Sequence, residues 1–108
     1  MIYAMNLYDL IPGKEDSYRE YMLKTAEIIA DLDAEPVASG HKPIKTMTGE
    51  PRSHFVIIKF ANLQVFETMI ERQNAKAINL LREEATENYI WTLYEDWDIA
   101  SWLFPDQA

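Results

Sequence analysis

The feature that most constrains the fold is that three of the four expected strands are apolar on both faces. The segment RSHFVIIKF, residues 52–60, contains four apolar residues in a row. The N-terminal MIYAMNLYDL, residues 1–10, and YIWTLYEDW, residues 89–97, also carry apolar side chains at both odd and even positions. Neighbouring strand residues point to opposite faces of a sheet, so these strands need a cover on each side.

Turn and capping residues divide the rest of the chain. A helix is expected over residues 15–32, after Pro12-Gly13, with a buried stripe at three- and four-residue spacing. VASGHKPIKTMTGE, residues 37–50, predicts a strand with an irregularity at Ser39-Gly40 and a hairpin turn at its end. Asn62 is expected to cap a second helix and Asn74 a further helical segment, each through its side-chain oxygen. The stripe of the first helix consists of Tyr18, Tyr21, Met22, Thr25, Ile28, Ile29 and Leu32.

The resulting order is strand, helix, strand, strand, helix, strand. This order predicts an α+β class, ferredoxin-like βαββαβ fold, in which helices cover one face of a four-stranded antiparallel sheet. We expect a single domain over residues 1–108. Helices on one face leave the other apolar face bare, and such a large patch is rarely left in water. A homodimer that packs sheet to sheet is the simplest cover.

Composition narrows the function. The chain has no cysteine, and its net charge of −8 opposes binding to nucleic acid or to anionic membranes. Its ten Lys and Arg residues are scattered along the sequence. The N-terminus lacks the pattern of a signal peptide, and no segment reaches the roughly 20 apolar residues of a membrane span. We therefore expect a cytoplasmic protein that binds neither nucleic acid nor membranes. With only three glycines and no phosphate-binding loop, no cofactor is expected.

Several segments resemble the dimeric α/β-barrel superfamily, in which two ferredoxin-like chains join their sheets into one barrel. PGKEDSYREYM, residues 12–22, is similar to a phrase common there. Within the superfamily the chain is most similar to the family called domain of unknown function 1330. The similar segments are PRSHFVIIKFANLQVFETMIE, residues 51–71, and NLLREEATENYIW, residues 79–91. The family positions are occupied here by Arg52, Phe60, Asn62, Leu63, Leu81, Arg82 and Ala85.

The chain departs from that family at one step. Relatives often carry S-P-E-Y between the two late helical segments, whereas this chain has RQNA, with Ala75 in place of the Tyr. Any role of that Tyr is therefore absent here. The resemblance implies a fold and a dimer. The family has no agreed reaction, so it transfers no catalytic residue to this chain.

The aromatic strand has two possible roles. Tyr89, Trp91 and Leu93 share one face, and Ile90, Thr92 and Tyr94 share the other. Aromatic residues pack well on a pleated surface, so one row could pack on helices and the other on a partner. Alternatively, one row lines a cavity for a small apolar or aromatic ligand with a polar group. Trp91 from one row and Tyr94 from the other are the candidate ligand-binding residues.

Other candidates are charged or titratable. His54 is the candidate catalytic base, since a histidine titrates near neutral pH. Arg52 and Arg82 could bind a carboxylate or phosphate, or form ion pairs with the surplus of acidic residues. His41 and His54 have no paired acid spacing, so no metal site is predicted. The acids Glu95, Asp96 and Asp98 are interpreted as solvated charges at the end of a strand.

Three functions remain in competition. The first is a homodimeric small-molecule-binding domain, and the sequence leaves its ligand unspecified. The second is a cofactor-independent monooxygenase or isomerase acting on an aromatic or polyketide-like substrate, with His54, Trp91 and Tyr94 in its site. The third is an RNA-binding module, which shares this strand order. RSHFVIIKF lacks the glycine and most of the aromatics that an RNA-binding third strand needs, and the negative charge opposes it.

Overall fold

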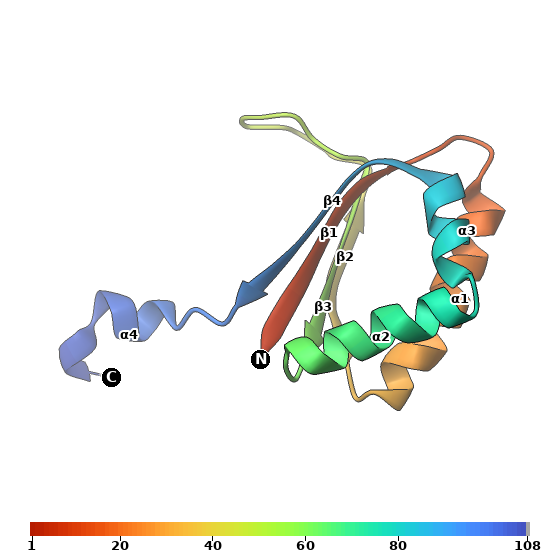
Figure 1. The fold of residues 1–108 in the computed structure, drawn as a ribbon. Helices are drawn as coiled ribbons and strands as arrows, with labels where there is room; N and C mark the ends of the chain where they lie inside the picture. Colours follow the sequence, from red (N-terminus) through yellow and green to blue (C-terminus); the bar gives the residue numbers. More distant parts are fainter. Residues whose placement is uncertain (108) are drawn as a thin grey trace.

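The computed structural model describes residues 1–107. The expected order of elements is present, followed by a short C-terminal extension (Figure 1). The elements are β1 (Ile2–Leu10), α1 (Glu15–Asp31), β2 (Glu35–His41), β3 (His54–Phe60), α2 (Leu63–Ala75), α3 (Ile78–Ala85), β4 (Thr86–Glu95), α4 (Ile99–Leu103) and the 3₁₀ helix η1 (Pro105–Gln107).

The four strands form one antiparallel sheet in the order β2-β3-β1-β4. The helices α1, α2 and α3 lie on one side of this sheet (Figure 1). This arrangement confirms the predicted α+β ferredoxin-like fold. We call the side that carries these helices the covered face and the opposite side the open face.

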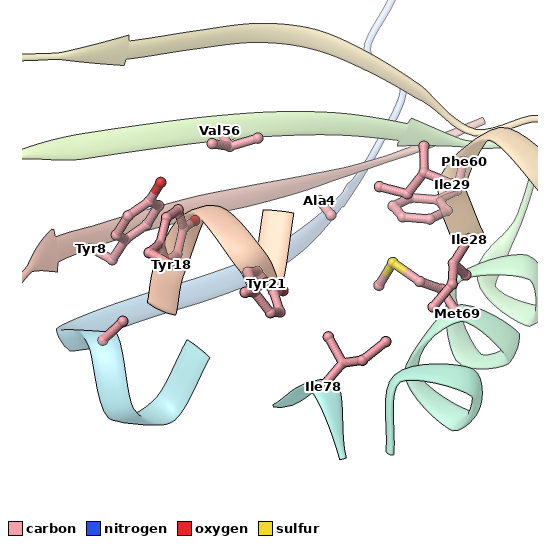
Figure 2. Packing of buried hydrophobic residues seen from close by; sticks show 11 residues of the cluster. Ala4, Tyr8, Tyr18, Tyr21, Ile28, Ile29, Val56, Phe60, Met69 and Ile78 are labelled. Carbon is pink, nitrogen blue, oxygen red and sulfur yellow. The ribbon is translucent and has the colours of Figure 1, made fainter. Parts of the chain in front are cut away.

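The core lies between the covered face and the helices. Alternate residues of β1, namely Ala4, Asn6 and Tyr8, are buried there, as expected for one face of a strand. Tyr8 from β1 lies beside Tyr18 from α1, and Phe60 lies near Met69 from α2 (Figure 2). The predicted stripe of α1 is confirmed at its buried positions Tyr18, Tyr21, Thr25, Ile28 and Ile29.

The open face carries the other alternate residues of the same strands. Tyr3 and Met5 of β1, Val37 of β2, Ile57 of β3 and Tyr94 of β4 surround a shallow apolar hollow of about 390 Å³. Tyr94 and Val37 are 53% and 51% exposed, although both are large and apolar. The prediction that these strands are apolar on both faces is therefore confirmed.

The structure corrects several predicted boundaries. The second strand ends at His41, and residues 42–53 form a long loop rather than a strand with a tight turn. The irregularity in β2 lies between Pro36 and Ala38, not at Ser39-Gly40. The ring of Phe55 instead packs directly against Gly40. A Cβ added at Gly40 would lie 2.3 Å from Cε1 of Phe55, so only glycine leaves room for the ring. The last strand begins at Thr86, three residues before the predicted start.

One of the two predicted caps is correct. The side chain of Asn62 accepts a hydrogen bond from Val65 N at 3.0 Å and begins α2. Asn74 lies inside α2 and caps nothing. The next helix instead follows Ala77, whose φ of 55° is left-handed, so the chain turns there without a side-chain cap.

Two segments extend beyond the open face. Residues 42–53 project from one end of the sheet, and the C-terminal extension projects from the other end (Figure 1). Both lie on the side away from α1, α2 and α3. Among residues 1–107, none of the helices is long and apolar enough to cross a membrane.

Candidate functional site

An apolar cavity on the covered face lies between α1 and the strands β2 and β3. This cavity has a volume of about 310 Å³ and is lined by side chains that include Met22, Ile29, Pro36 and Ile58. A smaller space of about 20 Å³ shares Met22, Thr25, Val56 and Ile58 with it. We call the two together the α1 cavity. Its volume suits a small molecule, and its walls are mainly apolar.

The small inner part of the α1 cavity is bordered by polar groups. Gln73 of α2 is 0% exposed, and its Nε2 donates to Tyr21 Oη at 3.2 Å and Thr25 Oγ1 at 3.0 Å. Its Oε1 has no protein partner. Hydroxyl groups both donate and accept, so whichever amide atom faces them, the other atom is left without a partner. A buried polar atom in this state costs about 1–3 kcal/mol.

A second unpartnered group belongs to Trp91 of β4. Its indole Nε1 is buried and makes no hydrogen bond, while its side chain lines the inner part of the α1 cavity. Trp91 therefore offers a donor, and Gln73 offers one amide atom. A bound polar group or water that accepts from Trp91 Nε1 would satisfy that buried donor.

Asn6 and Tyr89 form a satisfied polar pair beside these groups. Asn6 Nδ2 donates to Val56 O at 3.2 Å, and Tyr89 Oη donates to Asn6 Oδ1 at 2.6 Å. Burial raises the pKa of the Tyr89 hydroxyl above its ordinary value. Tyr89 therefore remains neutral at physiological pH and holds Asn6 in place.

Arg82 of α3 lies over an aromatic cage. Its guanidinium carbon is 4.8 Å from the centre of the Trp91 ring, 5.7 Å from that of Tyr21 and 5.8 Å from that of Tyr89. Such cation–π contacts fix the cation without neutralising it. Arg82 is half-buried, and none of the ion pairs in the described part of the chain involves it. It therefore offers positive charge beside the inner part of the α1 cavity.

His54 lies at the start of β3, outside the lining of the α1 cavity. Its Nδ1 is 2.8 Å from Ser53 Oγ, and its ring stacks on Tyr8 at 5.5 Å. Burial lowers the pKa of His54, the nearby His41 lowers it further, and Asp9 opposes both effects. The imidazole is therefore held neutral near pH 7, as a general base requires.

His54 borders a different depression, which we call the loop groove. This groove has a volume of about 390 Å³ and lies beneath the loop 42–53. The rings of His41 and His54, which are paired across β2 and β3, are 5.8 Å apart. The lining includes Leu7, His41, Lys42, Ile44, Lys45 and Arg52. The positive residues of the loop 42–53 thus gather in one groove.

The five candidate residues occupy three places. Trp91 and Arg82 lie together at the α1 cavity. His54 and Arg52 line the loop groove, and Arg52 Nε also donates to Asn88 O at 2.8 Å. Tyr94 borders the hollow of the open face. Sequence reasoning did not bring Trp91 and Arg82 together, because they belong to different elements.

Sequence reasoning missed Gln73 and Asn6. A signal for Gln73 existed, because it follows the inward-facing Met69 by four residues and so continues the buried stripe of α2. A polar residue in such a stripe indicates a buried hydrogen-bonded site. No group of three or more His, Cys, Asp or Glu side chains that could hold a metal ion occurs among residues 1–107.

Comparisons with known proteins agree with this fold. The model of a family described as Domain of unknown function (DUF1330) matches residues 3–94. No curated protein matches the sequence.

Three solved structures illustrate the similarity. RPA0582, a protein of unknown function from Rhodopseudomonas palustris, has a TM-score of 0.74 and 18% identity, covering 90% of this chain and 82% of that one. A NIPSNAP family protein of unknown function from Agrobacterium tumefaciens has a TM-score of 0.59 and 19% identity, covering 89% and 87%. SnoaB, a cofactor-independent oxygenase from Streptomyces nogalater, has a TM-score of 0.63 and 9% identity, covering 90% and 93%. At these identities the likeness shows the fold alone.

Proposed function

The chain belongs to the DUF1330 family, and from that premise we propose that it is a homodimeric small-molecule-binding domain. Two chains pack sheet to sheet through their open faces. Each chain holds a small, mainly apolar or aromatic ligand in its α1 cavity.

The observation that carries this proposal is the pair of unpartnered polar atoms on Gln73 and Trp91. Trp91 lines the small inner space that adjoins the apolar cavity of about 310 Å³, and Gln73 is hydrogen-bonded to Tyr21 and Thr25, which also line that space. A fully structural core would pair such groups or replace them with apolar ones. Their retention beside a cavity fits a ligand whose polar end reaches inward.

The surrounding groups define the chemistry of that polar end. Trp91 Nε1 requires an acceptor, and the adjacent guanidinium of Arg82 favours an oxygen with negative or partial negative charge. The walls of the cavity accept a hydrocarbon or aromatic body. Aromatic carboxylates, phenols and quinones have this combination of features.

A binding assay tests the ligand part of the proposal. Naphthoic acids, hydroxyquinones and medium-chain fatty acids are titrated while tryptophan fluorescence and melting temperature are recorded. A ligand at 100 times its Kd should stabilise the fold by about 2.7 kcal/mol. The proposal is rejected if none of these probes shifts the melting temperature and if a crystal structure shows side chains filling the cavity.

Substitutions then locate the ligand. We expect Trp91→Phe to weaken binding about tenfold, which is about 1.4 kcal/mol, because the indole N–H is lost. Trp97→Phe is the matched control, since Trp97 lies beyond β4 and is largely exposed. Equal losses of affinity in both variants would show that the ligand does not bind at the α1 cavity.

The dimer part of the proposal is supported by the open face. Its apolar hollow has no cover in the single chain, and large exposed apolar patches commonly mark interfaces. Light scattering at micromolar concentration should give twice the chain mass of 12.6 kDa. A chain that stays monomeric at this concentration contradicts the proposal.

A second candidate is an enzyme, namely a cofactor-independent monooxygenase or isomerase that acts on an aromatic or polyketide-like substrate. The lowered pKa of His54 favours it, because a neutral imidazole can accept a substrate proton. The oxygenase SnoaB shares the fold. Oxygen uptake or product formation with anthrones and hydroquinones, abolished in His54→Gln, would support it. If the wild-type protein turns over none of these substrates, this candidate is rejected.

A further inference from the structure

The C-terminal segment 96–107, which we call the arm, has an unusual composition. It carries three acids, Asp96, Asp98 and Asp106, and no Lys, Arg or His. Five large apolar residues accompany them, and each is at least half exposed. They are Trp97, Ile99, Trp102, Leu103 and Phe104.

The arm is nevertheless ordered within itself. Asp98 accepts hydrogen bonds from Ser101 N at 3.1 Å and Ser101 Oγ at 2.6 Å, which begins α4. The rings of Trp97 and Trp102 meet edge to face at 5.6 Å. A folded segment that exposes this much apolar surface, with Trp102 67% exposed, lacks its packing partner.

The loop groove has the complementary composition. Lys42, Lys45 and Arg52 line it together with both histidines of the chain. Apolar walls come from Leu7, Pro43, Ile44 and Phe55. Two carboxylates lie nearby: Asp9, which already accepts from Ser53 N and Asn88 Nδ2, and Glu50 within the loop. The surplus in the groove is positive, although the chain as a whole carries −8.

The arm and the loop groove lie at opposite ends of the sheet. Ile2 of β1 pairs with Phe60 of β3 and with Glu95 of β4, the residue before the arm. Tyr8, at the other end of β1, pairs with His54 of β3 in the loop groove. The six residue steps along β3 from His54 to Phe60 span about 20 Å. The arm also points away from its own sheet, beyond the open face (Figure 1). To reach its own groove it would have to turn back along the whole open face.

We propose that the arm of each chain docks in the loop groove of a second copy of the chain. The inference rests on the sheet-to-sheet dimer proposed above and adds a second contact to it. A two-fold axis that lies between the sheets and runs across the strands brings the arm end of one chain to the loop end of the other. Aromatic and aliphatic arm residues then meet the apolar walls, and arm carboxylates meet Lys42 and Lys45.

Cysteine cross-linking tests the docking directly, because the natural chain has no cysteine. One variant carries Ala100→Cys in the arm and another carries Thr46→Cys in the loop. Under mild oxidation, a mixture of the two should give a covalent dimer much faster than either variant alone. Ala100→Cys mixed with Lys76→Cys, on the helix side of the molecule, is the control and should not cross-link above background. A mixture that cross-links no faster than this control overturns the inference.

The double variant Ala100→Cys, Thr46→Cys distinguishes docking of the arm on its own chain from docking on a second chain. A disulfide within one chain, seen as monomer mass without reductant, would mean that the arm folds onto its own groove, and this overturns the inference. A disulfide between chains supports it.

Affinity measurements separate this inference from the dimer itself. Ending the chain after Glu95 should raise the dimer Kd at least tenfold in sedimentation experiments. Lys42→Glu with Lys45→Glu should do the same, whereas Lys24→Glu with Lys76→Glu, on the helix side, is the charge-matched control and should not. A truncated chain that dimerises with an unchanged Kd overturns the arm contact and leaves the sheet dimer standing. A full-length chain that never dimerises overturns both.

Discussion

The two faces of the sheet are built from the same strands and are both rich in apolar side chains, yet their surroundings differ. On the covered face, Tyr8 and Phe60 are almost completely buried under the helices. On the open face, Tyr94 remains largely exposed, one residue along β4 from the half-buried Leu93. The polar groups differ as well, since the buried hydrogen bonds of Gln73 with Tyr21 and of Tyr89 with Asn6 belong to the covered face. One face therefore maintains the fold of the chain, and the other is available for association.

Adjacent residues of β3 give the strongest test of this comparison. Val56 is buried on the covered face, and Ile57 borders the hollow of the open face. Val56→Asp should unfold the chain, because a buried unpaired charge costs about 3–5 kcal/mol. Ile57→Asp should leave a folded monomer. Circular dichroism and light scattering distinguish the two results.

Two tyrosines of β4 give a finer test with a smaller effect. Tyr89→Phe leaves Asn6 Oδ1 without its donor on the covered face and should cost about 1–3 kcal/mol. Tyr94→Phe should change stability by less than about 0.5 kcal/mol, because its hydroxyl group is on an exposed side chain. Urea unfolding in the Ile57→Asp background keeps dimerisation out of the measurement. Similar losses for both variants would mean that the two faces do not differ in this way.

Alkaline titration gives an effect that is absent at neutral pH and appears only above about pH 10. Burial raises the pKa of Tyr8, Tyr18 and Tyr89, all on the side of the sheet that the helices cover. The unfolded chain releases these protons near the ordinary pKa of 10, before the folded chain does. Stability is therefore complete below about pH 10 and decreases as pH rises further. Unfolding measured from pH 8 to 11 should show this decrease.

Tyr18→Phe is the variant that checks the cause. It removes one of the buried phenols, so its stability should decrease less steeply above pH 10. If the slope is the same as in the wild type, burial of Tyr18 does not contribute to the alkaline sensitivity.

The sequence predicted the fold because that prediction depends on local patterns. Alternation along the strands, the three- and four-residue spacing in α1 and the cap at Asn62 are all properties of neighbouring residues. Where a tertiary contact overrode local chemistry, prediction was wrong. Gly40 suggested a bulge, but it is crossed by Phe55 of the next strand. Asn74 suggested a cap, but it lies within α2, and the next helix follows Ala77, whose backbone is left-handed.

The candidate site was less predictable because it depends on which elements meet. Arg82 and Trp91 were both named as ligand-binding candidates, but their stacking at 4.8 Å requires α3 to lie against β4. Lys42, Lys45 and Arg52 line one groove because the loop 42–53 folds over the strand ends. Gln73 could have been found as a polar residue in an apolar stripe. The lack of a partner for its second amide atom is visible only in three dimensions.

The irregular pairing of β2 has a consequence for behaviour at high concentration. β2 is an edge strand, and an edge strand can recruit further strands from other molecules into growing aggregates. Pro36 offers no N–H to such an incoming strand, and the register shift between Pro36 and Ala38 bends the edge. Natural sheets use both devices against edge-to-edge polymerisation. This chain can therefore expose the apolar open face of its sheet while the edge strand β2 resists fibril growth.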